Sequence, residues 1–200
     1  NGGTMLSKRR RLCFESLESR RVLSAAATAA TVFVDIPANL TGQPGTQVVA
    51  PVNIDNAMGI RGAEVRISYD TALLDADNSS VRAGSVWPRG SAAVVANVND
   101  AAGSIVVFVF AAEGLPAGSG SLLEVHFALR SEATVGDSAS VDLVQVRLNE
   151  GAMAPNPEPA PGPDSTDGRI TCVGANGEAI ASEVVSVDTA NEDQPAQFAE

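Results

Sequence analysis

Short runs of alternating apolar and polar residues recur along the middle of the chain, separated by turn residues. In the segment GIRGAEVRISYD, Val65, Ile67 and Tyr69 fall at one set of alternate positions. Glu64 and Arg66 fall at the other set. Because successive side chains of a strand point to opposite faces, this pattern predicts a strand with one buried face and one polar face.

Nine strands are predicted from this alternation and from the Gly-, Asn-, Asp- and Pro-containing clusters between them. They are expected at Val32–Ile36, Gln47–Ile54, Ala63–Tyr69, Val81–Val86, Val94–Val98, Ser104–Phe110, Leu122–Leu129, Ser140–Leu148 and Gly168–Val173. Such regular spacing is typical of a β-sandwich or jelly roll and not of a parallel sheet with crossover helices. The predicted fold class is all-β. Its core is expected to be mainly aliphatic, because aromatic residues make up only 4% of the chain.

One domain and two flanking segments account for the 200 residues. The strands predict a sandwich over residues 31–174. Within it, the segment 155–166 contains the run PNPEPAPGP, which cannot donate hydrogen bonds along a ladder and is predicted to be an exposed loop before the last strand. Residues 175–200 are acidic and weakly patterned, and are predicted to be a disordered tail or the start of a connection to more protein.

Residues 1–30 are predicted to be a basic leader or sorting segment rather than part of the fold. The cluster KRRR is followed by LCFESLESRRVLSAAATAA, in which charged residues interrupt the apolar stretch that an ordinary secretory signal requires. The segment LESRRVL resembles the Leu-Glu-Pro-Arg-x-Leu-Leu leader motif of large surface or secreted proteins in one bacterial phylum, with Ser19 in place of the proline and Val22 in place of a leucine. This resemblance favours a secreted or cell-surface protein. The alternative is a basic amphipathic N-terminal tail.

Charge divides the chain at the end of the leader. Six of the 13 basic residues lie in the first 24 positions, and the remainder has seven arginines against 22 acidic residues, a net charge of −15. An acidic surface repels phosphate backbones and anionic lipids, so nucleic acid is not expected as a partner. The sequence has no run of 18 apolar residues that would predict a transmembrane helix.

Residue types that carry catalysis or bind metal are sparse. His126 is the only histidine, and alternation places it on the outer face of a strand, exposed beside Glu124. The segment DADNSS, which begins at Asp75, starts like a calcium loop but lacks the Gly at position 6 and has Val86 at position 12, so an ordinary turn is predicted. With the other cysteine in the leader, Cys172 has no disulfide partner and is predicted to be a half-buried strand thiol. The chain is therefore predicted to be non-enzymatic and to hold no cofactor or metal.

The segment SIVVFVFAAE is apolar at both sets of alternate positions. One set is Val106, Phe108 and Phe110, and the other is Ile105, Val107, Val109 and Ala111. A strand that is apolar on both faces is predicted to be central in its sheet. The second set is predicted to face outward, where a binding partner rather than water would cover Val107 and Val109.

Five segments, taken together, resemble cohesin domains in their order and spacing. They are Pro51 to Asn56, Gly59-Ile60-x-Gly62, Tyr69-Asp70 followed by Leu73-Leu74, Ile105 to Ala112, and the alternating Leu123, Val125 and Phe127. The resemblance extends over residues 32–173. It implies a nine-stranded β-sandwich with jelly-roll topology that has no catalytic activity and binds dockerin modules. It also implies that calcium belongs to the dockerin partner and not to this chain.

Carried over by position, the resemblance places a docking face on the sheet that contains residues 63–69 and 104–110. Gly62 and Glu64 fall where the family often has Asn and then Asp, and Val109 falls on the apolar contact. The residues implied to bind the partner are Gly62, Glu64, Arg66, Asn97, Asn99, Val107, Val109, Ala111 and Glu113. An apolar centre would supply most of the affinity and a polar rim the partner choice. The partner is expected to be a dockerin-bearing protein in an extracellular or cell-surface assembly, with a link to polysaccharide breakdown.

Two alternatives stay open. A carbohydrate-binding module needs exposed aromatic rings that stack on sugars, and the chain offers one tryptophan, Trp87, while Tyr69 is predicted to point inward. A structural or adhesive spacer domain would bind nothing specific, and substitutions on the docking face would then leave binding and localisation unchanged.

Overall fold

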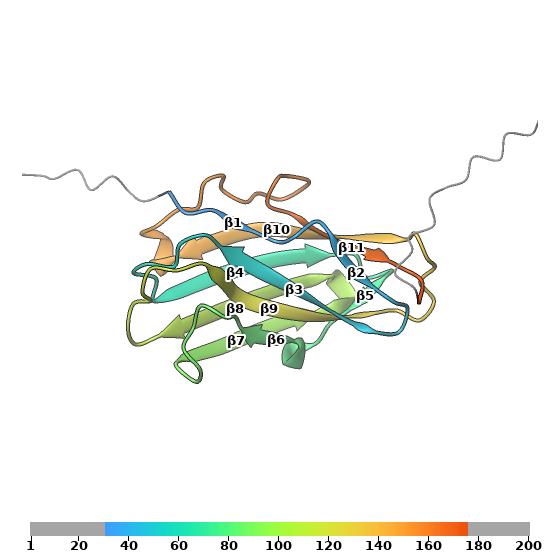
Figure 1. Ribbon diagram of the computed structural model, residues 1–200, viewed down its shortest axis with the longest axis horizontal. Helices are drawn as coiled ribbons and strands as arrows, with labels where there is room; N and C mark the ends of the chain where they lie inside the picture. Colours follow the sequence, from blue (N-terminus) through green and yellow to red (C-terminus); the bar gives the residue numbers. More distant parts are fainter. Residues whose placement is uncertain (1–30, 176–200) are drawn as a thin grey trace, which may run out of the picture.

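The computed structural model describes residues 31–175, which form a β-sandwich (Figure 1). One sheet has the order β1 (Val34–Asp35), β3 (Gln47–Ile54), β9 (Gly120–Leu129), β5 (Leu74–Asp75), with β6 (Val81–Ala83) also paired to β9. The other has the order β2 (Leu40–Gly42), β11 (Gly168–Cys172), β10 (Ser138–Leu148), β4 (Gly62–Tyr69), β8 (Ser104–Ala111), β7 (Ala92–Asn99). Short 3₁₀ helices follow three of the strands: η1 (Asn78–Ser80), η2 (Asp100–Ala102) and η3 (Asn149–Gly151).

The predicted all-β sandwich is confirmed, and each of the nine predicted strands overlaps a strand of the structure. The described residues contain two further strands, β2 and β5, which are three and two residues long. Strands this short show no alternation, and only their pairing with β11 and β9 defines them. β6 ends before the predicted Val86, because the amides of Gly84 and Val86 bond to the adjacent carbonyls of Leu122 and Ser121 and so leave the regular ladder.

The core between the two sheets is mainly aliphatic. Val65, Val107 and Val125 come from three different strands and have no exposed surface. Full burial of a side chain of this size stabilises the fold by roughly 1.5–3 kcal/mol. The rings of Tyr69 and Phe127 add a tilted aromatic contact, with centroids 5.0 Å apart.

The loop that follows β10 packs against that strand. The pairing of β10 with β4 shifts register between Asp142 and Gln145, so the regular ladder is interrupted there. Oδ2 of Asp142 accepts a hydrogen bond from Gly162 N at 2.9 Å, and Oδ1 of Asp167 accepts one from Leu143 N at 2.9 Å. Pro159 of this loop is buried, so the Pro-rich segment is anchored to the sandwich rather than fully exposed as predicted.

Two side chains are more covered than the sequence indicated. Cys172 was predicted to be half-buried, but it is 1% exposed, and burial raises the pKa of its thiol. His126 does lie on the outer face of β9, yet its side chain is only 18% exposed, with Nε2 3.9 Å from Oε2 of Glu124. Alternation within one strand separates the two faces but does not reveal how far a side chain on either face is covered.

The turn before β6 is an ordinary cap, as predicted. The Asp77 side chain accepts hydrogen bonds from the amides of Ser79 and Ser80 and thereby caps η1. The predictions of a leader at 1–30 and of a tail after residue 175 concern parts of the chain outside the described residues. In residues 31–175, the structure contains no helix that is long and apolar enough to cross a membrane.

Candidate functional site

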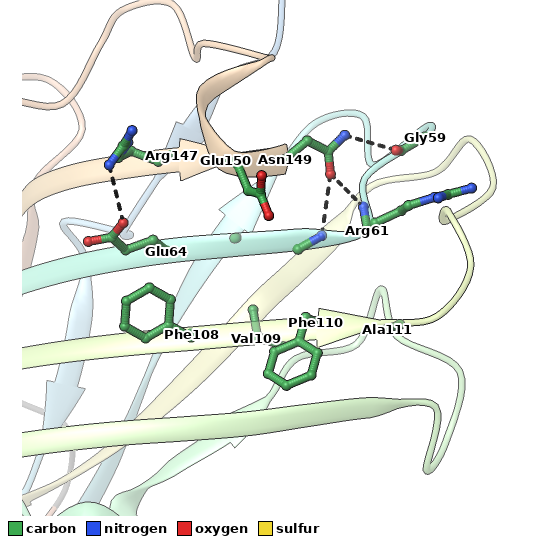
Figure 2. A pocket seen from close by; sticks show the side chains of 12 residues that line it. Gly59, Arg61, Glu64, Phe108, Val109, Phe110, Ala111, Arg147, Asn149 and Glu150 are labelled. Atoms are coloured by element: carbon green, nitrogen blue, oxygen red, sulfur yellow. Dashed lines mark hydrogen bonds and ion pairs between the residues drawn. The ribbon is translucent and has the colours of Figure 1, made fainter.

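The outer face of β10, β4, β8 and β7 carries aligned rows of side chains that run across the strands. In one row Arg147 of β10 stands opposite Glu64 of β4, which stands opposite Phe108 of β8 and then Val95 of β7. Residues paired directly across strands share a face, so these four side chains form one band on the outside of the sheet. Gly62 and Phe110 belong to the next row (Figure 2).

Three apolar side chains of this face are exposed to solvent. Val95 is 58% exposed, Phe108 45% and Phe110 49%. Large apolar groups that gather on one sheet face, with charged residues beside them, are typical of interaction sites.

The orientation predicted for β8 was wrong. Val107 and Val109, expected to face outward, are 0% and 1% exposed, while Phe108 and Phe110 face outward. The cause is register: Val107 pairs with Val65, and Val65 points into the core, so Val107 must do the same. Because SIVVFVFAAE is apolar on both faces, alternation within this strand could not decide between them.

Ala111 ends β8 and is half-buried. Its amide donates a hydrogen bond to the Arg61 carbonyl at 2.8 Å, which holds the start of β4 against the end of β8. Ala111 and Val109 both contribute atoms to the lining of the hollow described below, although the side chain of Val109 is buried.

Glu64 is held by two arginines. Its Oε1 accepts hydrogen bonds from Nε and Nη2 of Arg66 at 3.0 and 2.8 Å. Its Oε2 lies 3.6 Å from Nη1 of Arg147. The Glu64 side chain is 14% exposed, while both arginines are about half exposed (49% and 52%), so a mostly covered carboxylate is neutralised by two surface cations. The predicted outward orientation of Glu64 and Arg66 therefore agrees with the structure.

A turn after β10 closes one side of this face. Oδ1 of Asn149 accepts hydrogen bonds from Arg61 N at 2.7 Å and Gly62 N at 3.3 Å. Nδ2 of Asn149 donates to the Gly59 carbonyl at 3.0 Å. Asn149 and Glu150 have φ values of 48° and 59°, in the left-handed region that few residues other than glycine adopt. The three hydrogen bonds hold this unusual turn against the start of β4 (Figure 2).

Strands β4 and β8 and the turn after β10 border an open hollow of about 710 Å³. Its lining includes Gly62, Phe108, Phe110, Arg147 and Glu150. Gly62 contributes no side chain, so the backbone of β4 forms part of the floor. The sequence analysis did not identify Arg147, Asn149 or Glu150. They lie more than 80 positions from Gly62, and no local pattern indicates a left-handed turn there.

The other predicted site residues are less closely associated with the hollow. Asn97 is exposed on β7, in the row of Val106 and Arg66. Oδ1 of Asn99 accepts a hydrogen bond from Ala102 N at 3.3 Å and caps η2, which is a structural role. Glu113 is exposed in the loop after β8.

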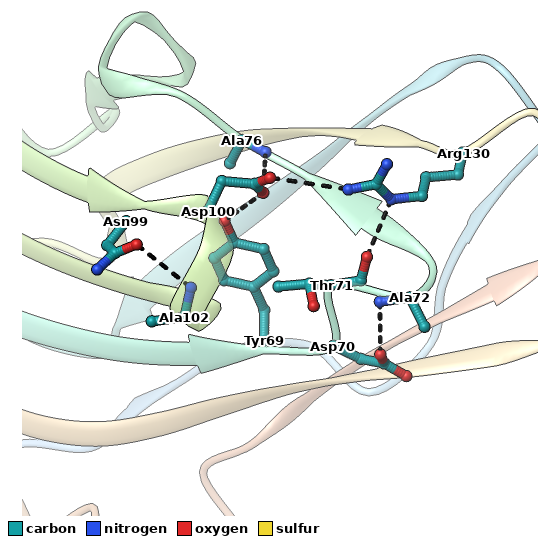
Figure 3. A network of polar contacts seen from close by, with 9 residues as sticks. All are labelled: Tyr69, Asp70, Thr71, Ala72, Ala76, Asn99, Asp100, Ala102 and Arg130. Carbon is teal, nitrogen blue, oxygen red and sulfur yellow. Dashed lines mark hydrogen bonds and ion pairs between the residues drawn. The ribbon is translucent and has the colours of Figure 1, made fainter.

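A second polar network lies where β4 and β7 end, and it serves the fold (Figure 3). The Tyr69 hydroxyl donates a hydrogen bond to Oδ1 of Asp100 at 2.9 Å, and Nη2 of Arg130 lies 3.7 Å from Oδ2 of Asp100. Nε of Arg130 donates to the Thr71 carbonyl at 2.9 Å. Burial raises the pKa of Tyr69, and the hydrogen bond to Asp100 raises it further. The hydroxyl therefore remains protonated and acts as a donor.

Trp87 cannot supply a sugar-stacking ring in this structure. It is 5% exposed, and its Nε1 donates to the Leu122 carbonyl at 2.7 Å. Within residues 31–175, no group of three or more His, Cys, Asp or Glu side chains is arranged to hold a metal ion.

Comparisons with known proteins identify the fold and the family. A family model described as the cohesin domain matches residues 32–155, more than half of the chain. No curated protein matches the sequence.

Several solved structures share the fold. The third cohesin ScaC of Acetivibrio cellulolyticus, in complex with the ScaB dockerin, is 20% identical, covers 72% of this chain and 100% of its own, and has a TM-score of 0.56. The sixth cohesin of scaffoldin B from the same organism, in complex with a Cel5 dockerin, is 20% identical over 71% of this chain and 99% of its own, with a TM-score of 0.53. A non-cellulosomal cohesin of the archaeon Archaeoglobus fulgidus is 19% identical over 72% of this chain and 93% of its own, with a TM-score of 0.53.

Proposed function

Because this chain belongs to the cohesin domain family, we propose that it binds a dockerin-bearing protein through the outer face of β10, β4, β8 and β7. The protein acts by binding and not by catalysis. The observation that carries the proposal is the exposed apolar group Val95, Phe108 and Phe110, which lies beside the paired charges of Glu64. Two of the three cohesin structures described above contain a bound dockerin.

The physical basis is an interface whose apolar centre excludes water. Covering the two phenylalanine rings and Val95 removes apolar surface from water, at about 25 cal/mol per Å². The ion pairs around Glu64 are formed before docking, so a partner does not have to order these side chains itself. Ordering long side chains costs about 0.5–1.5 kcal/mol each, and a preformed rim avoids that cost.

The test is isothermal titration calorimetry of the whole chain against dockerins encoded in the same genome, with and without calcium. Calcium is expected to act on the dockerin side. Phe108→Asp should weaken binding at least tenfold, because it places an unpaired charge in the centre of the interface. The matched control is Val49→Asp, which introduces the same charge at a 39% exposed valine on the opposite sheet and should change nothing. A spacer domain predicts that neither variant alters any binding.

The proposed setting is outside the cell or on its surface. The resemblance of LESRRVL to a surface-protein leader motif supports export, and the acidic composition suits an extracellular surface. Surface proteolysis of intact source cells tests the setting. Loss of the domain without cell lysis is expected, whereas complete protection in intact cells contradicts it.

A further inference from the structure

We propose that the hollow over Gly62 is a socket for one bulky apolar side chain of the partner, such as leucine. Arg61 and Glu150 orient the incoming segment by pairing with one acidic and one basic residue that flank this side chain. The inference rests on the proposed function, because the socket lies on the same face, and it adds the chemistry that the partner must present.

The absence of a side chain at Gly62 opens the hollow. A Cβ atom at this position would lie 3.3 Å from Cβ of Phe110 and 3.3 Å from the Val109 carbonyl oxygen. The first atom of any side chain would therefore already touch the wall, and a longer one would occupy the hollow. The φ of Gly62 lies outside the left-handed region, so the backbone does not require glycine here. The feature that glycine provides at this position is the empty space.

The walls of the hollow select an apolar occupant. Phe108 and Phe110 are each about half exposed and supply the apolar wall of the hollow. A leucine-sized group placed here would remove both its own surface and parts of two rings from water. Apolar anchors of this kind, seated in pockets near the centre of an interface, carry most of the affinity in protein complexes.

Most polar groups around the hollow already have partners within the chain. Glu64 is paired with Arg66 and Arg147, and Asn149 makes three hydrogen bonds to the start of β4. The carboxylate of Glu64 and the amide of Asn149 are therefore already satisfied when a partner covers them. They form a ring that excludes water from the apolar centre.

Two charges at the hollow differ from this ring. Arg61 and Glu150 line the hollow, and neither forms an ion pair with any residue in the described part of the chain. Figure 2 shows the Arg61 side chain leaving one end of the hollow and the Glu150 carboxylate standing above β4. Two unpaired charges of opposite sign at different points of the rim favour one direction of an incoming segment over the reverse, because reversal brings like charges together.

The charges at the hollow are balanced, whereas the rest of the domain is acidic, and this difference favours the hollow as the docking point. Residues 31–175 contain 16 acidic residues and seven arginines. Two of these arginines, Arg61 and Arg147, line the hollow, where they balance Glu64 and Glu150. A segment that carries both signs of charge meets no net repulsion at the hollow, in contrast to the acidic remainder of the domain.

The shape of the socket is tested by filling it. Gly62→Leu should weaken binding at least tenfold for the dockerin that binds most tightly in the calorimetry described above. The control, Ala128→Leu, places the same leucine side chain at an exposed outer position of β9 on the opposite sheet and should leave binding unchanged. Unfolding of both variants in urea, followed by the fluorescence of Trp87, shows whether Gly62→Leu still folds. If Gly62→Leu binds as tightly as Ala128→Leu while Phe108→Asp abolishes binding, the socket is overturned and the docking face stands.

The charged rim is tested by reversal. Arg61→Glu and Glu150→Lys should each reduce affinity about two- to fivefold at low salt, the scale of exposed ion pairs. The double variant should not recover wild-type affinity for the same dockerin. Each of its two charges then repels the partner residue that the wild-type charge attracts. An equal affinity of wild type and both single variants at low salt overturns the orienting role.

A small molecule that carries a leucine side chain tests the socket even if no dockerin binds. Titration of the ¹⁵N-labelled chain with Nα-acetyl-L-leucine amide should shift the amide signals of Gly62 and Glu150. Nα-acetyl-L-asparagine amide should not, and Gly62→Leu should abolish the leucine response. Such shifts without dockerin binding support the socket and refute the proposed function. Equal responses to the two amides, or no response to either, overturn the socket.

Discussion

Asn149 offers a quantitative test of how the docking face is built. Its side chain satisfies the amides of Arg61 and Gly62 and the carbonyl of Gly59, at 2.7, 3.3 and 3.0 Å. A net hydrogen bond contributes about 0.5–1.5 kcal/mol, and alanine in a left-handed conformation costs roughly 1–2 kcal/mol. Because the Arg61 amide is exposed and water can replace part of the loss, Asn149→Ala is expected to lower the free energy of unfolding by about 2–4 kcal/mol.

Two further substitutions at the same position separate these contributions. Asn149→Gly accepts the positive φ of 48° but makes no side-chain hydrogen bond, so its loss should be smaller than that of alanine by about 1 kcal/mol. Asn149→Asp retains the acceptor for Arg61 N and Gly62 N, but a carboxylate oxygen replaces the Nδ2 group that donates to the Gly59 carbonyl and to Met153 Sδ. Its loss should be at least about 1 kcal/mol, because this oxygen faces another acceptor.

The assay is urea unfolding followed by Trp87, the single tryptophan, which is buried. Amide hydrogen exchange at Gly62 provides a local readout, which should accelerate in Asn149→Ala before global unfolding does. A stability change below about 0.5 kcal/mol for Asn149→Ala, with unchanged exchange at Gly62, would refute the reasoning. The three hydrogen bonds of Asn149 would then contribute nothing to stability.

Three other predictions follow from single contacts. Val109→Asp should prevent folding or lower the free energy of unfolding by more than about 3 kcal/mol, because it buries an unpaired charge, whereas Phe108→Asp should fold. Circular dichroism and urea unfolding of the two variants show which side chain points into the core. Equal stabilities would contradict the assigned orientation of β8. Tyr69→Phe removes the hydroxyl that donates to Asp100 and should cost about 1 kcal/mol in urea unfolding; a fully neutral change would show that the bond contributes nothing. Burial raises the pKa of Asp142, so its charged form, which is present at pH 7, destabilises the folded state. Asp142→Asn should therefore raise the free energy of unfolding at pH 7, and this gain should shrink as pH falls through the raised pKa. A gain that does not vary with pH would contradict this cause.

Much of this architecture was predictable from the chain because it depends on local pattern. The alternation of β4 predicts which of its residues are buried, and the structure places Glu64 and Arg66 outward as expected. β7 and β9 follow the same rule, since each has one clearly more polar face. The order of apolar runs and turn residues therefore indicated a sandwich before any contact between strands was known.

The docking face depends on information that no single strand carries. β8 is apolar on both sides, so only its pairing with Val65 fixed Val107 inward and Phe108 outward. Asn149 and Glu150 reach the same face from a turn more than 80 residues away, in a left-handed conformation that no sequence pattern marked. The two-residue alternation of apolar and polar side chains determined the strands of this protein. The register between strands, and the turn that brings Asn149 and Glu150 to β4, decided which residues form the surface that a partner meets.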